Sequence, residues 1–408
     1  MKKASRSGAD RWRRELLRRV GAIGLFAALA GQASTSAGGL SPGKSQSGSP
    51  RNGKATAAIE VAQRGVYASA PLRQTAINVC AIQSRVRSVD LRNLDATVKA
   101  NLAHVLTLID QAQGSAEEWG GERLWGAKQD LICLHEHPIE GFQPWTRKEL
   151  ERVAFDLPGR ESEAIGAKAR KYGCYIAFGC YARDRDWPRH AINMSVIVGP
   201  TGEIIAKHWK ARSILGLFGD NALLNTTVFD VLDRYVEMYG WDAVLPVART
   251  DIGNIAMTSV GGEPMLYTAL AMKGAELLIM TVTGGNNPEA AIQTAKQNRI
   301  YTVGVGNSVS YDNIGFAEGA GAEDGGTTIV DPRGTQLAQS SNHHEDVVSA
   351  RVPIDEFRRL RRFPEFPMAL LLPVFQQYRP RYAPNFFLEQ LPENYREAGD
   401  LVRKRMGG

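Results

Sequence analysis

The sequence lacks the features that would place it in several common classes of protein. It has four cysteines in 408 residues, and they show neither the close pairs of a zinc site nor the crowding of a disulfide framework. It also lacks a glycine-rich phosphate loop and a dinucleotide-binding fingerprint. We therefore expect no metal and no cofactor. The cysteines are predicted to be core residues, and Cys133 with Cys180 is the one candidate pair for a disulfide.

Net charge is missing from all but one end of the chain. The formal net charge is +6, but residues 1–19 hold eight lysines and arginines against two acidic residues. The remaining residues are therefore neutral overall. A nucleic-acid partner needs a basic face on the folded part of a protein, so this charge distribution excludes one.

A hydrophobic run long enough to cross a membrane is absent from the N-terminal region. The uncharged stretch over 20–30 has eleven positions, whereas a spanning helix needs about 20. A basic start, a short apolar stretch and small residues are typical of an export signal. Arg13-Arg14, followed by an apolar pair, resembles the twin-arginine motif. We interpret residues 1–33 as such a signal, which predicts a periplasmic or secreted protein with no stable membrane span after processing. A basic amphipathic helix on a cytoplasmic protein is the alternative.

The rest of the chain divides into three parts by composition. Residues 34–70 begin with a stretch rich in Gly, Ser and Pro, which predicts a flexible linker and a lead-in to the folded part. Residues 71–357 have the composition of one folded domain. Residues 358–408 form a tail rich in Arg, Pro and aromatic residues, which we expect to lie at an oligomer interface. We therefore predict a homodimer or a larger oligomer.

Strand patterns and helix patterns alternate through the predicted domain. This alternation, with hairpins inside it, predicts an α/β fold with mixed sheets. The predicted strands are 76–83, 130–136, 175–182, a hairpin over 192–210, 254–259, 277–283, 301–307 and a hairpin over 325–340, and the predicted helices are 93–113, 161–172, 264–273 and 288–298.

Three of these strands end beside residues that could carry chemistry. Glu136 lies in "LHEHPIEGF", Lys210 ends "GEIIAKHWK", and Ser259 precedes Val260 in "TSVGG". Hydrolysis of an amide by covalent catalysis needs a nucleophile, a carboxylate that takes its proton and a cation that stabilises the oxyanion. A Ser-His-Asp triad fits less well, because Met257 stands where the nucleophile turn of that class has glycine.

The order and spacing of these segments resemble the nitrilase, or carbon-nitrogen hydrolase, superfamily. Glu136 with Gly141 five residues later matches one family motif, and 202–210 matches the family's lysine hairpin. Further matching segments are Asn193, "AMKGAELLI" (271–279), "AKQNRIY" (295–301) and "GGTTIVDPRG" (325–334). The resemblance implies a four-layer αββα sandwich of two mixed β-sheets. It also implies that Glu136 is the catalytic base and Lys210 the catalytic lysine.

The sequence departs from the family at the nucleophile, because no cysteine follows the strand 254–259. An ungapped alignment from Gly253 puts Val260 at the cysteine position. An alignment backward from "AMKGAE" is about two residues short, which puts Thr258 or Ser259 there instead. We predict that Ser259 is the substitute nucleophile and that Gly261 and Gly262 form a backbone turn for the oxyanion.

Two functions remain open at this point. The first is an exported hydrolase of a small non-peptide amide, nitrile or related C–N compound. The second is an inactive member of the superfamily that binds a small amide or carboxylate. Both need Glu136 and Lys210, so these residues do not discriminate between the two functions.

Overall fold

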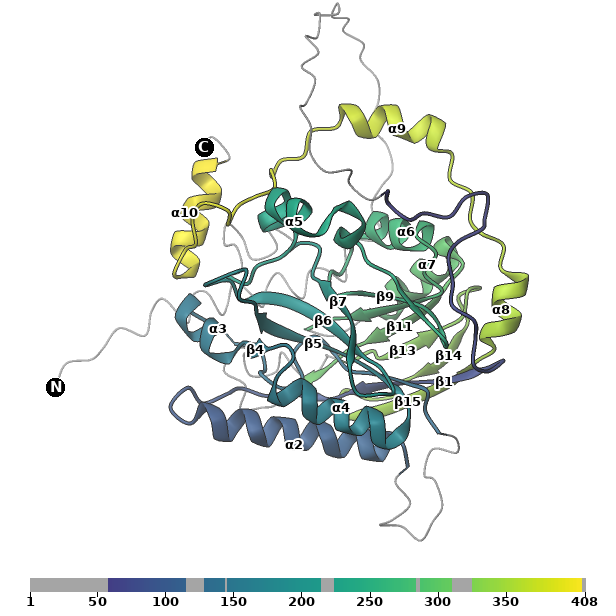
Figure 1. Ribbon diagram of the computed structural model, residues 1–408, viewed down its shortest axis with the longest axis horizontal. Coiled ribbons are helices and arrows are strands. Elements are labelled where there is room, and N and C mark those ends of the chain that lie inside the picture. Colours follow the sequence, from purple (N-terminus) through teal and green to yellow (C-terminus); the bar gives the residue numbers. More distant parts are fainter. Residues whose placement is uncertain are drawn as a thin grey trace, which may run out of the picture.

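Two β-sheets lie face to face in the computed structural model, and helices cover the outer face of each sheet (Figure 1). The structure describes residues 58–114, 128–143, 145–213, 224–283, 287–309 and 325–405. The predicted four-layer αββα sandwich is confirmed. The predicted export signal, residues 1–33, and residues 34–57 of the predicted linker lie outside the described residues.

The first sheet contains seven strands, which are β1 (Ile77–Gln83), β3 (Leu131–Cys133), β4 (Phe155–Asp156), β5 (Tyr175–Arg183), β6 (Ile192–Val198), β7 (Ile204–Trp209) and β15 (Asp346–Val352). Their order is β15-β1-β3-β5-β6-β7, and β4 pairs with β5. Strands β1, β3 and β5 run parallel, and β5, β6 and β7 run antiparallel. The carboxyl ends of β3 and β5 therefore meet at one edge of the sheet.

The second sheet contains six strands, which are β8 (Ala248–Thr250), β9 (Gly253–Thr258), β10 (Leu277–Thr281), β11 (Tyr301–Val305), β13 (Thr328–Val330) and β14 (Gln336–Gln339). Their order is β14-β13-β11-β10-β9-β8, with β9, β10 and β11 parallel. A separate two-stranded ladder joins β2 (Arg85–Val86) to β12 (Ser308–Val309). Both main sheets are mixed, as the sequence predicts.

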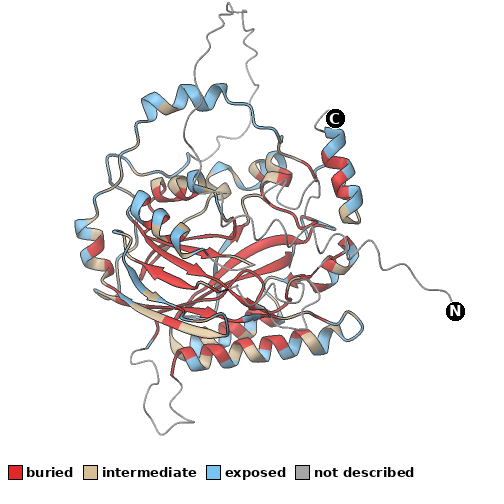
Figure 2. Ribbon diagram, turned by 180° about the vertical axis from the view of Figure 1, so that it is seen from behind, coloured by how far each residue is buried: buried red, intermediate tan, exposed pale blue. Residues whose placement is uncertain are grey.

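Alternation along the strands divides the core into layers. On β1, Ile77, Val79 and Ala81 face the second sheet, while Cys80 and Ile82 face the helices. This follows from the period of two in a strand, where successive side chains point to opposite faces. Strands buried on both faces read as continuous apolar runs, and Figure 2 shows the buried strands at the centre of the molecule.

Helices close the two outer faces. The helices on the first sheet are α2 (Leu94–Ala112), α3 (Arg147–Val153) and α4 (Arg160–Tyr172), those on the second are α6 (Pro264–Met272) and α7 (Pro288–Asn298), and the others are α5 (Leu232–Tyr239), α8 (Ile354–Leu360), α9 (Met368–Gln377) and α10 (Tyr395–Arg405). Helix α2 buries Val98, Leu102, Val105 and Ile109, the spacing that gives one apolar face. Within the described ranges, no helix is long and apolar enough to cross a membrane.

The predicted disulfide between Cys133 and Cys180 is wrong. Both thiols are free and buried. Cys133 pairs with Ala177 across β3 and β5, so Cys180 lies three residues further along β5, on the opposite face of the sheet. Cys133 packs between the sheets and Cys180 packs under the helices. The sheet itself separates the two sulfur atoms.

The lead-in and the tail both contact the domain. In the lead-in, the Ala62 amide donates to the Met272 carbonyl, and the Tyr67 hydroxyl donates to Glu276. In the tail, Ala398, Leu401 and Val402 of α10 join the core under the first sheet. Helix α9 precedes α10 in the tail and has no buried residue. Its ribbon is mostly pale blue in Figure 2.

Candidate active site

A sharp turn after β3 places Glu136 at the carboxyl ends of the parallel strands of the first sheet. Two glycines allow this placement. Gly141 has a φ of +70°, and a Cβ there would lie 1.7 Å from the Arg87 carbonyl oxygen. A Cβ on Gly179 of β5 would lie 2.3 Å from the Glu136 carbonyl oxygen. The backbone around Glu136 is therefore packed so closely that neither position admits a side chain.

Lys210 follows β7 and reaches the same point. Its Nζ donates to Glu136 Oε1 at 2.8 Å, and the Asn193 amide donates to that oxygen at 2.8 Å. The Lys210 amide donates to the Asn193 carbonyl oxygen, which fixes the lysine to β6. The structure thus brings together two residues that are 74 positions apart in the sequence. We name Glu136 and Lys210 the charged pair.

Burial and charge act in opposite directions on Glu136. Burial alone would raise the pKa of this carboxyl group, because it disfavours the charged form. The electrostatic interactions with Lys210 and His137, together with the hydrogen bonds from Lys210 and Asn193, outweigh burial and lower the pKa to about 2. Glu136 is therefore a carboxylate at neutral pH. Within the described residues its Oε2 has no hydrogen-bond donor, so this is the oxygen left to accept a proton.

The turn between β9 and α6, residues 259–263, is the elbow, and it offers few fixed contacts. Ser259 is 4% exposed, and its Oγ has no hydrogen-bond partner in the part of the chain that the structure describes. Val260 is buried, and its carbonyl oxygen accepts from the Tyr267 hydroxyl at 2.7 Å. A Cβ added at Gly261 or Gly262 would meet no atom of the described residues within 4 Å. The elbow therefore borders open space.

An ion pair connects the elbow to the lysine segment. The Arg212 guanidinium, two residues after Lys210, donates to the carboxylate of Glu263. The second sheet supplies Glu263 and the first sheet supplies Arg212, so this contact crosses between the sheets. It brings the elbow and the charged pair to the same end of the sandwich.

Several polar residues around the charged pair were not assigned a role from the sequence. Asn193 was named only as a position that matches the family. For Arg212, the sequence indicates nothing beyond its closeness to Lys210. His137 and Glu140, both buried beside Glu136, belong to "HEHPIE", where four ionisable side chains occur within six residues. That density of ionisable side chains directly after a buried strand is the signal that could have found them.

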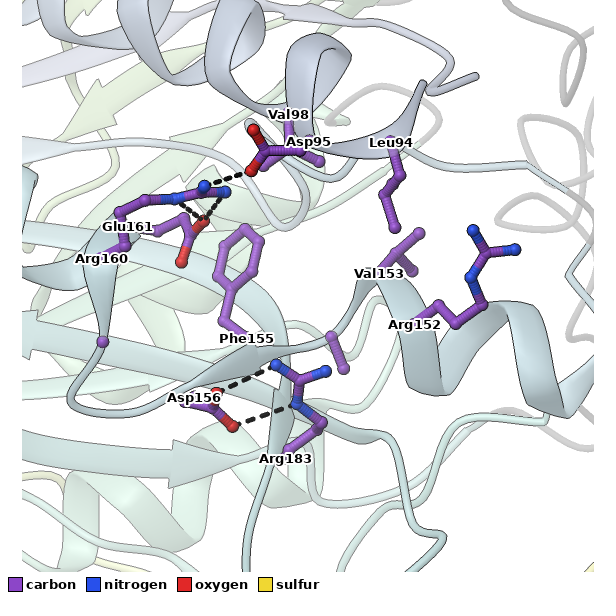
Figure 3. A pocket seen from close by; sticks show the side chains of 12 residues that line it. Leu94, Asp95, Val98, Arg152, Val153, Phe155, Asp156, Arg160, Glu161 and Arg183 are labelled. Atoms are coloured by element: carbon purple, nitrogen blue, oxygen red, sulfur yellow. Dashed lines mark hydrogen bonds and ion pairs between the residues drawn. The ribbon is translucent and has the colours of Figure 1, made fainter. Parts of the chain in front are cut away.

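A hollow on the outer surface lies away from the charged pair. It has a volume of about 320 Å³ and lies between α2, α4 and β4, above Phe155 (Figure 3). Arg183 pairs with Asp156, and Arg160 pairs with Glu161. Figure 3 shows these ion pairs on its wall. It contains none of the residues predicted for the site.

Comparison with known proteins assigns the family. The model of the carbon-nitrogen hydrolase family matches residues 85–362. This chain therefore belongs to the carbon-nitrogen hydrolase family, as the motifs around Glu136 and Lys210 indicate.

Curated relatives are distant. A bifunctional nitrilase/nitrile hydratase of Lupinus angustifolius is 25% identical over 239 residues, which cover 52% of this chain and 61% of the relative. A formamidase of Helicobacter acinonychis (strain Sheeba) is 26% identical over 234 residues, which cover 55% of this chain and 61% of the relative. The match thus spans about three fifths of each relative.

Among solved structures, the NitFhit protein of C. elegans has a TM-score of 0.50 at 16% identity. The superposition covers 75% of this chain and 66% of that one. At this identity the likeness shows the fold alone. It agrees with the two mixed sheets and flanking helices described above.

Proposed function

We propose that this protein hydrolyses a C–N bond of a small non-peptide amide or a related compound such as a nitrile. The observation that supports the proposal is the charged pair, in which Lys210 and Asn193 both hold Oε1 of the buried Glu136. A carboxylate fixed in this way, whose second oxygen has no donor among the described residues, is suited to take a proton from a nucleophile. The amidase-like and nitrilase-like relatives act on bonds of this class.

In the proposed reaction, Ser259 Oγ attacks the carbonyl carbon of the amide, and its proton passes to Glu136. Lys210 and the backbone amides of Gly261 and Gly262 stabilise the oxyanion. The C–N bond then breaks, and the leaving amine takes the proton from Glu136. Water, activated by the same carboxylate, releases the acid from the acyl-serine. As Lys210 turns toward the oxyanion, its hold on Glu136 weakens, and the carboxylate becomes a stronger base.

A specific observation favours the second candidate, a protein that binds an amide or carboxylate without turnover. The elbow has no cysteine, and a hydroxyl ionises far less readily than a thiol. In addition, a carboxyl group with a pKa of about 2 is a weak base in the unliganded protein. Both candidates use the same charged pair, so the distinction depends on chemistry at the elbow.

Turnover and binding assays together separate the two candidates. Formamide, acetamide, propionamide and acetonitrile are offered to the mature protein, and release of ammonia is measured. Amide hydrolysis that is lost in both Ser259→Ala and Glu136→Gln supports the first candidate. Acetamide binding by calorimetry, without ammonia release from any variant, supports the second. Ser162→Ala is a matched control, because Ser162 is a buried serine at the start of α4, on the outer side of the first sheet.

Export and assembly are separate parts of the proposal. The basic start and Arg13-Arg14 support transport to the periplasm or outside the cell. Replacing both arginines with lysine is expected to leave the precursor inside the cell, which fractionation would measure.

The exposed apolar residues of α9 support a dimer or larger oligomer through the tail. Leu370 is 74% exposed and Val374 is 64% exposed, and exposed apolar patches are typical of interfaces. A monomeric mass by light scattering at micromolar concentration would contradict this assembly.

A further inference from the structure

A buried imidazole lies between two carboxylates beside the charged pair. His137 is 1% exposed and Glu140 is fully buried. His137 Nδ1 lies 2.9 Å from Glu140 Oε1, and His137 Nε2 lies 3.7 Å from Glu136 Oε1. The first contact is a hydrogen bond. The second is an electrostatic contact with the oxygen that Lys210 also holds.

Neighbouring groups fix the orientation of this ring. Its face stacks on Tyr181, with the ring centroids 4.1 Å apart and the planes 22° from parallel. The Tyr181 amide also donates to Glu140 Oε1 at 2.7 Å. Tyr181 therefore contacts both His137 and Glu140. Its ring stacks on the imidazole, and its backbone amide binds the carboxylate.

We propose that His137, oriented by Glu140, is a positioning residue that sets the basicity of Glu136. The inference rests on the proposed function, because it concerns the residue that acts there as the base. Glu140 faces Nδ1, so Nε2 is directed at Glu136, in the same way that an outer carboxylate orients a catalytic imidazole. When Lys210 moves to the oxyanion, the contact with His137 keeps Glu136 in place.

The electrostatics of the cluster give the sign of the effect. Burial raises the pKa of Glu136, and the electrostatic interaction with His137 is, after that with Lys210, one of the causes that lower it. Members of this cluster also have an electrostatic influence on three other titratable groups, His135, Cys180 and Tyr181. Burial lowers the pKa of His135 to about 3 and raises those of Cys180 and Tyr181, so these three are uncharged at neutral pH. Removing His137 therefore raises the pKa of Glu136.

The first experiment measures the pH profile of acetamide hydrolysis. In His137→Gln, the acid limb of kcat/KM is expected to move to higher pH by about one pH unit, the usual effect of a nearby charge. Glu140→Gln is expected to shift it in the same direction, because the ring loses its orienting carboxylate, and Glu140→Asp is expected to restore part of the wild-type profile. His190→Gln is the control. His190 is another buried histidine, bonded to Thr226, and its loss is expected to leave the profile unchanged.

A second experiment needs no turnover. Protein labelled with ¹³C at the glutamate carboxyl carbons is titrated by NMR, and Glu136→Gln assigns the signal. The Glu136 signal is expected to stay that of a carboxylate down to pH 4 in the wild type and to titrate at higher pH in His137→Gln. An unchanged titration in a folded His137→Gln protein would overturn the inference. If the titration shifts but no variant hydrolyses an amide, the proposed function fails and this inference stands.

Discussion

The two halves of the candidate site are built in opposite ways. On the first sheet, Glu136 is surrounded by Lys210, Asn193 and His137, and the adjacent backbone has no room for another atom. On the second sheet, the elbow has a serine hydroxyl without a partner and two glycines without close neighbours among the residues that the structure describes. The half with the charged pair is thus preorganised, while the elbow is the half where we predict a departure from the family pattern.

This difference shows where a departure from the family pattern can be tolerated. A change on the first sheet leaves a buried charge without its partner, which costs far more than the loss of an exposed contact. A change at the elbow replaces one small side chain beside empty space.

The largest effect is expected from Lys210→Met. The variant leaves the buried Glu136 carboxylate without its cation, and breaking such a pair costs about 3–5 kcal/mol. The free energy of unfolding, measured in urea at pH 7, should fall by that amount. Lys168→Met is the matched control, because its ion pair with Asp110 is partly exposed and is worth about 1 kcal/mol or less. Equal losses in the two variants would show that the charged pair has no special role in stability.

Acid should weaken the first sheet through Glu136. Its pKa in the folded protein is about 2, below the ordinary value of 4.5. The stabilisation is therefore fully present above pH 4.5 and is lost as the pH falls from 4.5 toward 2, with a total of about 3 kcal/mol. The difference in unfolding free energy between the wild type and Glu136→Gln should shrink between pH 6 and pH 3. A difference that stays constant with pH would contradict the lowered pKa.

A thiol at the elbow should increase amide turnover if the elbow holds the nucleophile. Ser259→Cys is expected to raise amide turnover at least about tenfold, equivalent to about 1.4 kcal/mol of barrier, because a thiol ionises more readily. Val260→Cys tests the ungapped alignment in the same assay. A gain in Val260→Cys alone would reassign the nucleophile position. No gain in either, with both proteins folded, would favour the binding protein.

The smallest effects are expected at the two glycines of the elbow. Gly262 has a φ of +71° with free space around it, so Gly262→Ala should cost about 1 kcal/mol of backbone strain. Gly261 has the same space without a positive φ, and Gly261→Ala should change stability little. Thermal unfolding of both variants would measure this. A large loss in Gly261→Ala would show that the space is filled.

The sequence by itself determined the layers and most of the elements. The predicted strand at 76–83 is β1 (Ile77–Gln83), and the predicted helix at 93–113 is α2 (Leu94–Ala112). These agree because apolar periodicity is a local property that a single segment carries. The elements that were not predicted are the strands β2, β4, β8, β12 and β15 and the helices α3, α5, α8, α9 and α10. The shortest of them carry too little periodicity to be recognised.

Only the tertiary structure decided which side chains meet. Family motifs brought Glu136 and Lys210 together in the prediction, but nothing local shows that Glu263 pairs with Arg212 or that His137 lies between two carboxylates. The same reason explains why the disulfide was predicted wrongly: Cys133 and Cys180 both read as buried, and burial does not show on which face of a sheet a side chain lies. Strand register fixes that face, and register depends on partners far along the chain.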